Sequence, residues 1–320
     1  MSNPNLVFFL SLLFILFGYF LKRIRLLNEK DSKSISKIII NVTLPALIIR
    51  TIAGTDLIPS LIFLPFSAIG YGAIVCGILL YTNKKKTPED KAILSMGSIG
   101  FNNGMFAYPI IEGIFGLTGL QYLAFFDIGS GLSVFGLSYM LAAYFRAKKD
   151  QSDFQMTPSI FFRMIFGSIP FISYIVALTL NLSQLPIPSF IDGVLAVPAR
   201  ADMFLVLVLI GIHLNFSLEG ADRKKIIQIL GLRYGLGIVL SIFIMNLSID
   251  IEQLRGVLSI LFILPVSMTI LPYSNTFGYE LKTGGVLVNY SILISFCLMW
   301  GLINICLLYT SDAADDSIRV

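Results

Sequence analysis

Two adjacent asparagines lie inside a long apolar stretch, residues 92–115, which would otherwise form a continuous helix. Asn102 and Asn103 each bring an amide donor and an amide acceptor. Gly104 and Pro109 weaken the helix around them. Because an unpaired amide is costly away from water, these four residues suit a break that faces a polar solute. We interpret them as binding residues, with a simple packing kink as the alternative.

A second apolar stretch, residues 254–273, carries similar breaks. Pro265 and Pro272 each remove a backbone donor, and Ser267 lies between them. A broken helix exposes its ends, which carry partial charges that can bind a solute. We therefore predict that Pro265, Ser267 and Pro272 complete the binding site.

Ionisable residues inside apolar stretches are also candidates for chemistry. Arg200 could hold a carboxylate through paired hydrogen bonds, with a structural ion pair as the alternative. Asp127 and Asp202 could carry a coupling proton, because burial favours the protonated carboxyl. For Asp127 the alternative is a helix-end carboxylate that faces external water. Glu112 and His213 are interpreted as surface and interfacial residues.

The composition indicates which elements must position these residues. Hydrophobic residues make up 56% of the 320 and charged residues only 13%, whereas soluble domains are about a quarter charged. In lipid every backbone group must be satisfied within the chain, which allows helices or a closed barrel. The apolar runs are continuous and near the roughly 20 residues of a spanning helix, so we predict helices. With a single histidine, a metal site is not expected.

Apolar windows between charged or Pro/Gly-rich breaks predict ten spans. They are residues 6–21, 35–52, 57–81, 92–115, 117–145, 158–182, 186–214, 225–247, 254–273 and 283–308.

Most of the 23 Lys and Arg residues follow odd-numbered spans, and Arg233 is counted with them. The exceptions are Arg50, Arg200, Arg255 and Arg319. Because Lys and Arg gather in cytoplasmic loops, both termini are predicted to lie outside a multi-pass plasma membrane. The positive balance then reflects topology and does not indicate a nucleic-acid partner.

Five spans on each side of a linker would enter the membrane from opposite sides, which is the arrangement of an inverted repeat. Pro109 and Pro272 fall at similar depths in the fourth span of each half, and Pro45 and Pro198 interrupt the second. The predicted fold is all-α integral membrane, ten helices in two inverted five-helix repeats, with helices four and nine broken. Its parts are a first repeat 1–146, a cytoplasmic linker 147–157, a second repeat 158–308 and a tail 309–320.

Three segments of the chain resemble the auxin efflux carrier family, which includes plant PIN carriers and bacterial permeases for malate or malonate. They are NVTLPA at 41–46, GFNNGMFAYPIIEGIFG at 100–116 and IGIHL at 210–214. The resemblance implies that helices four and nine unwind and cross at prolines, Pro109 and either Pro265 or Pro272. It also implies a substrate site beside that crossing, between a scaffold and a core that moves like an elevator. The short linker suits a compact prokaryotic permease.

We therefore predict a secondary active transporter of small organic anions such as malate or malonate, without a cofactor. A sodium-coupled organic anion symporter of similar fold and an auxin-like weak-acid exporter are the alternatives. A membrane-embedded enzyme is less favoured, because the chain lacks metal-protease, nucleophile-elbow and Walker motifs. The partners expected are the anion and the lipid bilayer. Proton or sodium coupling and a homodimer stay open.

The end of the chain changes abruptly from an apolar helix to an Asp-rich sequence after about residue 305. Residues 306–316 resemble a translated sequencing adapter, so residues 309–320 are predicted to be a non-native tail.

Overall fold

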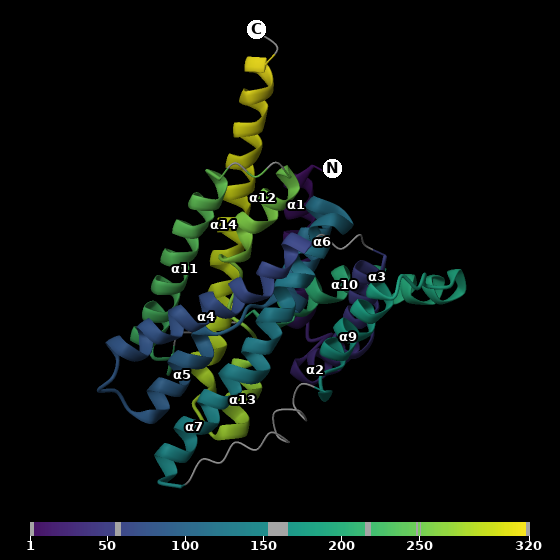
Figure 1. The fold of residues 1–320 in the computed structure, drawn as a ribbon. Helices are drawn as coiled ribbons and strands as arrows, with labels where there is room; N and C mark the ends of the chain where they lie inside the picture. Colours follow the sequence, from purple (N-terminus) through teal and green to yellow (C-terminus); the bar gives the residue numbers. More distant parts are fainter. Residues whose placement is uncertain are drawn as a thin grey trace.

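The computed structural model describes residues 3–54, 59–152, 166–214, 219–247, 249 and 251–317. Every regular element in this part of the chain is helical (Figure 1), which confirms the predicted all-α class. The α-helices are α1 Pro4–Arg23, α2 Glu29–Ile38, α3 Leu44–Ala53, α4 Phe63–Thr82, α5 Pro88–Ser98, α6 Tyr108–Leu132, α7 Tyr139–Asp150, α9 Ile169–Leu182, α10 Ser189–His213, α11 Arg223–Met245, α12 Glu252–Leu261, α13 Ile270–Phe277 and α14 Leu281–Ser317. Short π-helical turns are η1 Ile39–Thr43, η3 Asn103–Ala107 and η4 Ser133–Ser138, and η2 Pro59–Ile62 is a 3₁₀ turn.

Seven helices in the described residues are long and apolar enough to cross a membrane. One of them, Asn103–Asp150, has a kink at Gly116, whose φ of 63° is non-helical. The broken pair α12 and α13 is too short for this criterion. The ten-span arrangement, its repeats and its linker stay predictions, since residues 153–165 lie outside the description. The side chains of the predicted tail also lie outside it.

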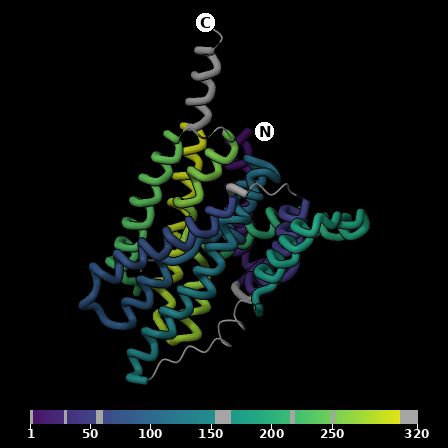
Figure 2. The backbone as a smooth tube through the Cα atoms, in the orientation of Figure 1, coloured from purple at the N-terminus to yellow at the C-terminus, as the bar shows by residue number. Residues whose placement is uncertain are grey.

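The helices form two groups. The first group contains α1, α2, α3, α9 and α10, in which α1 packs along α10 and α3 along α9. The second group contains α4, α5, α7, α11, α12, α13 and α14, and α6 contacts both groups. Figures 1 and 2 show α3, α9 and α10 to the right and α4, α5 and α11 to the left. Asn5, in α1, accepts a hydrogen bond of 2.8 Å from Trp300 of α14, so both terminal helices reach the same end of the molecule.

Glycines set the close packing of the first group. A Cβ on Gly18 would lie 2.2 Å from the carbonyl oxygen of Val208, and one on Gly211 would lie 2.0 Å from that of Ile15. Membrane helices associate through such small residues because lipid provides no hydrophobic drive between them. The α1–α10 contact therefore depends on the absence of two side chains.

Not all of the predicted proline breaks exist. Helix α10 continues through Pro198, and Pro45 lies at the start of α3, after the π turn η1. Pro272 lies in the first turn of α13, where a missing N–H removes no helical hydrogen bond. Pro109 lies near the start of α6, which continues from the π turn η3 without a break. The fourth stretch instead unwinds at residues 99–102, ahead of Pro109.

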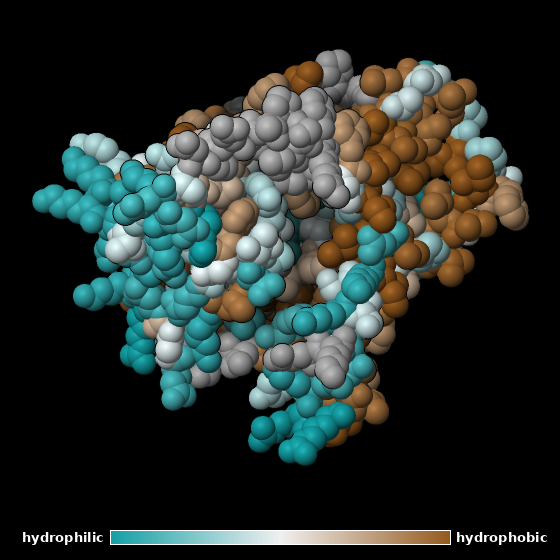
Figure 3. Space-filling model, turned by 90° about the horizontal axis from the view of Figure 1, so that it is seen from below, coloured by the Kyte–Doolittle hydropathy of each residue, from teal (hydrophilic) through white to brown (hydrophobic). Residues whose placement is uncertain are grey.

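Lysine-rich turns gather at one end of the molecule, which we call the basic end; it includes Lys37, Lys84, Lys149 and Lys282. Figure 3 looks onto this end and shows hydrophilic residues around a central hollow.

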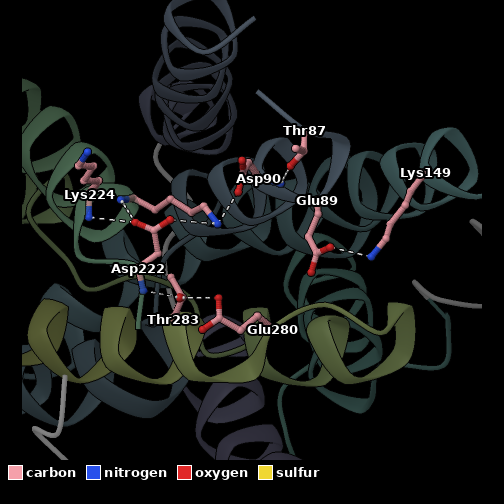
Figure 4. Close-up of polar contacts among 9 residues, drawn as sticks. Thr87, Glu89, Asp90, Lys149, Asp222, Lys224, Glu280 and Thr283 are labelled. Carbon is pink, nitrogen blue, oxygen red and sulfur yellow. Dashed lines mark hydrogen bonds and ion pairs between the residues drawn. The ribbon is translucent and has the colours of Figure 1, made fainter. Parts of the chain in front are cut away.

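An ion-pair network ties the second group together at the basic end (Figure 4). Lys225 of α11 pairs with Asp90 of α5, and with Asp222 at 3.3 Å. The backbone N–H of Asp222 donates to Thr283 of α14 at 3.0 Å. Three helices of the second group are therefore joined by one buried lysine and its partners.

Candidate functional site

Two helix breaks meet in the middle of the second group. Helix α5 ends at Ser98 and η3 begins at Asn103, while α12 ends at Leu261 and α13 begins at Ile270. We call residues 99–102 and 262–269 the junction. Its two strands of chain run antiparallel, with a bridge between Phe101 and Val266. The backbone N–H of Asn102 donates to the carbonyl oxygen of Pro265 at 2.9 Å.

Serines satisfy backbone donors that the breaks leave free. The N–H of Phe101 donates to Ser130 Oγ at 3.1 Å, and the N–H of Val266 donates to Ser291 Oγ, also at 3.1 Å. Ser130 lies in α6 after Gly116, and Ser291 lies on α14, the helix after α13. At both breaks, a serine hydroxyl from a later part of the chain therefore accepts a hydrogen bond from a backbone N–H group.

Arg233 of α11 is fully buried at the junction. Its Nη1 donates to Ser98 O at 2.9 Å and its Nη2 to Gly100 O at 2.8 Å. Counting Arg233 among the loop cations was therefore wrong. Its position nine residues into an apolar stretch was the signal that could have identified it, because an ionisable residue there is costly unless it has a role.

A cavity of about 480 Å³ lies between the two groups and borders the junction. It reaches the basic end, where Lys33, Lys37 and His213 line it. The lining residues used below are Lys33, Lys37, Leu44, Asn102, Asn103, Gly104, Asp127, Phe171, Tyr174, Ser267, Met268, Thr269 and Pro272.

A polar cluster forms one wall of the cavity. Asn103 Nδ2 donates to Asp127 Oδ1 at 2.6 Å, and the Tyr174 hydroxyl donates to Asp127 Oδ2. The hydroxyls of Tyr108 and Tyr174 are 2.6 Å apart. In the described part of the chain, Asn102 Nδ2 and Asn103 Oδ1 are buried and lack hydrogen-bond partners. One amide donor and one amide acceptor beside the cavity are therefore unpaired.

The breaks also orient helix ends. The first residues of η3 and of α13 line the cavity, at Asn103 to Met105 and at Leu271. N-terminal helix ends carry partial positive charge and backbone N–H groups without helical partners. With Lys33 and Lys37 one turn apart at the mouth, the cavity is suited to an anion.

Six predicted residues line this cavity and four do not. Those that line it are Asn102, Asn103, Gly104, Asp127, Ser267 and Pro272. Pro109 and Pro265 are buried behind it. Arg200 is exposed on α10 and lies outside the cavity, as does Asp202, which is buried and accepts a hydrogen bond from Thr43.

Sequence reasoning missed the lysines at the mouth and Tyr174. Lys33 and Lys37 were interpreted only as loop cations, although their i, i+4 spacing places both on one helix face. Nothing local in the sequence singles out Tyr174, since its role comes from α9 packing beside α3 and α6. Among the described residues no group of three His, Cys, Asp or Glu side chains could hold a metal ion.

The comparison with known families decides what kind of protein this is. A family model described as membrane transport protein matches residues 6–303. The chain belongs to this family. Its relatives include an uncharacterized transporter of Methanothermobacter thermautotrophicus, 25% identical over 255 residues, which cover 76% of this chain and 81% of that protein. An uncharacterized transporter of Methanocaldococcus jannaschii is 27% identical over 224 residues, 66% of this chain and 69% of that protein.

Membership of this family confirms a membrane transporter, and with it the broad part of the auxin efflux carrier resemblance. It places the polar cavity at the junction within a membrane transporter.

Proposed function

We propose that this transporter carries small organic anions and binds them in the cavity beside the junction. The observation that carries the proposal is the presence of two N-terminal helix ends, η3 and α13, at one cavity. Lys33 and Lys37 add positive charge at the mouth, and the free amide atoms of Asn102 and Asn103 offer hydrogen bonds.

The walls favour an anion with an apolar body. Leu44, Phe171 and Met268 contribute apolar surface, while the amides and hydroxyls lie at the junction. Pockets of this kind bury an apolar portion and orient the ligand with a few polar groups. An auxin-like aromatic acid therefore fits this lining, and malate or malonate would use the polar end alone. Both belong to the proposed substrate class, and the experiment below compares them.

Asp127 favours coupling of anion binding to the binding of a proton. An ionised carboxylate beside a bound anion is repulsive, and a proton on Asp127 removes that repulsion. Tyr174 and Asn103 hold the carboxyl in place in either state. We propose that one proton accompanies the anion; sodium coupling is the alternative.

The position of the cavity between two helix groups supports an elevator-like movement. The second group holds the junction, while the first group supplies Leu44 and Tyr174. We propose that the second group moves along the first and carries the substrate with it. In the prokaryotic plasma membrane the basic end would face the cytoplasm, which is consistent with its lysines. A homodimer would need its own test.

The test is uptake of labelled malate, malonate and indole acetate into proteoliposomes, with and without an imposed proton gradient. Asn103→Ala and Asp127→Asn are expected to abolish uptake that the gradient stimulates, and Lys37→Gln to weaken it. Arg200→Ala is the matched control, since Arg200 lies outside the cavity. Uptake that survives Asn103→Ala and is lost with Arg200→Ala would move the site to α10.

A further inference from the structure

The guanidinium of Arg233 is surrounded by backbone oxygens from both breaks. Besides Ser98 and Gly100, its Nη2 lies 3.4 Å from the carbonyl oxygens of Leu264 and Pro265. The oxygens of Leu264 and Pro265 lie in the segment after α12. Those of Ser98 and Gly100 lie at the end of α5 and just beyond it. One fixed positive charge thus lies among four carbonyl dipoles.

One of these dipoles belongs to Ser98, the last residue of α5, and the other three lie in the unwound chain beyond α5 and α12. The C-terminal end of a helix carries partial negative charge, which a cation stabilises. Helix α5 ends at Ser98, whose carbonyl Arg233 binds directly. Without a cation, the junction would bring several carbonyl oxygens together with nothing to offset their mutual repulsion.

Arg233 has no acidic partner in the part of the chain that the structure describes. None of the ion pairs between described residues involves Arg233, and the Nε atom of Arg233 has no hydrogen-bond partner there. The Phe101 ring lies 4.3 Å from the guanidinium carbon, and the Tyr71 ring 5.9 Å from it. Aromatic rings therefore cover the charge, and its counter-charges are backbone oxygens alone.

Carbonyl oxygens at unwound membrane helices are also the ligands with which transporters bind sodium. We propose that Arg233 is a tethered cation that occupies, at this junction, the place of an exchangeable alkali-metal ion. The positive charge that holds the two breaks together is then part of the chain. If the transport activity is as proposed above, it follows that uptake needs neither Na⁺ nor K⁺, which leaves the proton at Asp127 as the coupling ion.

The cation itself is tested without transport, by thermal unfolding of the purified protein in detergent. Melting temperatures are compared in NaCl, KCl and N-methylglucamine chloride at equal ionic strength. The wild type is expected to melt at one temperature in all three salts. Arg233→Ala should melt lower in N-methylglucamine and recover part of the loss, saturably, in NaCl or KCl, because a small cation can enter the vacated carbonyl cage.

Tyr234→Phe is the matched control on the same helix. It removes a buried hydroxyl that contacts Ser291 and Ser295 but leaves Arg233 in place, so its lower melting temperature should be the same in all three salts. Arg233→Ala without a cation-specific recovery, or a wild type that Na⁺ specifically stabilises, would overturn the proposal. Should Arg233→Ala yield no folded protein, Arg233→Lys decides: a tethered ammonium should restore folding in all three salts, and failure to do so counts against a cation role.

The transport arm separates the two proposals. Wild-type uptake that is equal in Na⁺ and N-methylglucamine supports the consequence for coupling, and stimulation by Na⁺ contradicts it. Absence of uptake for every acid counts against the proposed function, while the melting data still decide the role of Arg233.

Discussion

Helix α11 carries two buried cations that stabilise the second group in different ways. Lys225, at the basic end, pairs with the carboxylates of Asp90 and Asp222. Arg233, two turns further along, binds only backbone carbonyls. Both cations connect α11 to α5. The counter-charge of Lys225, near water, is a pair of carboxylates that can titrate. The counter-charge of Arg233, at the junction, is a set of backbone carbonyl oxygens that cannot.

The difference teaches where a break in a membrane helix can be tolerated. A carboxylate at the junction would need its own desolvation, which is expensive in low dielectric. Carbonyl oxygens are already there because the helices end, so a single guanidinium satisfies several at once. The fork of donors of arginine suits this task better than the point charge of lysine.

The largest expected effect is that of Arg233→Met. It removes the charged donor of four buried carbonyl groups, of which that of Pro265 keeps a second donor, the N–H of Asn102. Losing such a buried charged contact is expected to cost about 3–5 kcal/mol of unfolding free energy. Denaturant unfolding in detergent measures it. If Arg233→Met destabilised no more than Lys225→Met, the contrast between the two cations would be wrong.

The serines at the junction come next. Ser130→Ala and Ser291→Ala each leave a buried backbone N–H unpaired, at Phe101 and at Val266, with an expected loss of about 1–3 kcal/mol each. Ser241→Ala is the control, because its hydroxyl bonds only within its own helix. Equal losses for all three would show that the junction serines have no special role.

At the basic end, Lys225→Met is expected to lower the unfolding free energy by about 1 kcal/mol, because the carboxylates that the buried lysine pairs with are partly exposed and screened by water. The same unfolding assay measures it, and the loss should shrink with added salt. A loss that ignores salt would argue for packing of the lysine stem instead.

Acid should distinguish the two cations further. Burial alone would raise the pKa of Asp90 and of Asp222, but hydrogen bonds and charge from Lys225 outweigh it and hold each pKa below its usual value. A carboxyl whose pKa is lower in the folded protein than in the unfolded chain stabilises the fold at pH values above its unfolded-state pKa. That stabilisation is lost as the pH falls through the folded-state pKa. The gap in melting temperature between wild type and Lys225→Met should therefore close below about pH 4. The gap for Arg233→Met should persist there, since carbonyls do not titrate.

The smallest effect belongs to the exposed pair of Lys149 and Glu89, 2.6 Å apart on α7 and α5. The two side chains are 39% and 33% exposed, so Glu89→Gln should change stability by roughly 0.5 kcal/mol or less. A loss as large as that of Lys225→Met would mean that exposure does not rank these ion pairs.

Local chemistry accounts for the parts that sequence reasoning predicted. The helical class follows from long apolar runs, and the unwound segment near Asn102 follows from glycine and asparagine in such a run. Residues whose role depends on helix rotation were predicted less well. Arg200 and Asp202 lie two positions apart, so one is exposed and the other buried against Thr43. Lys33 and Lys37 border the cavity only because α2 packs beside α10.

The sequence by itself determined that this is a helical membrane protein with two interrupted helices, because hydropathy and backbone-breaking residues act over a few turns. Only the tertiary structure decided which residues form the meeting point of the two interruptions, that Arg233 from a third helix holds their carbonyls, and that Asn103, Asp127 and Tyr174 share one cavity. These contacts join residues far apart in the chain. They depend on how the helices turn and pack against one another, and no local pattern encodes that arrangement.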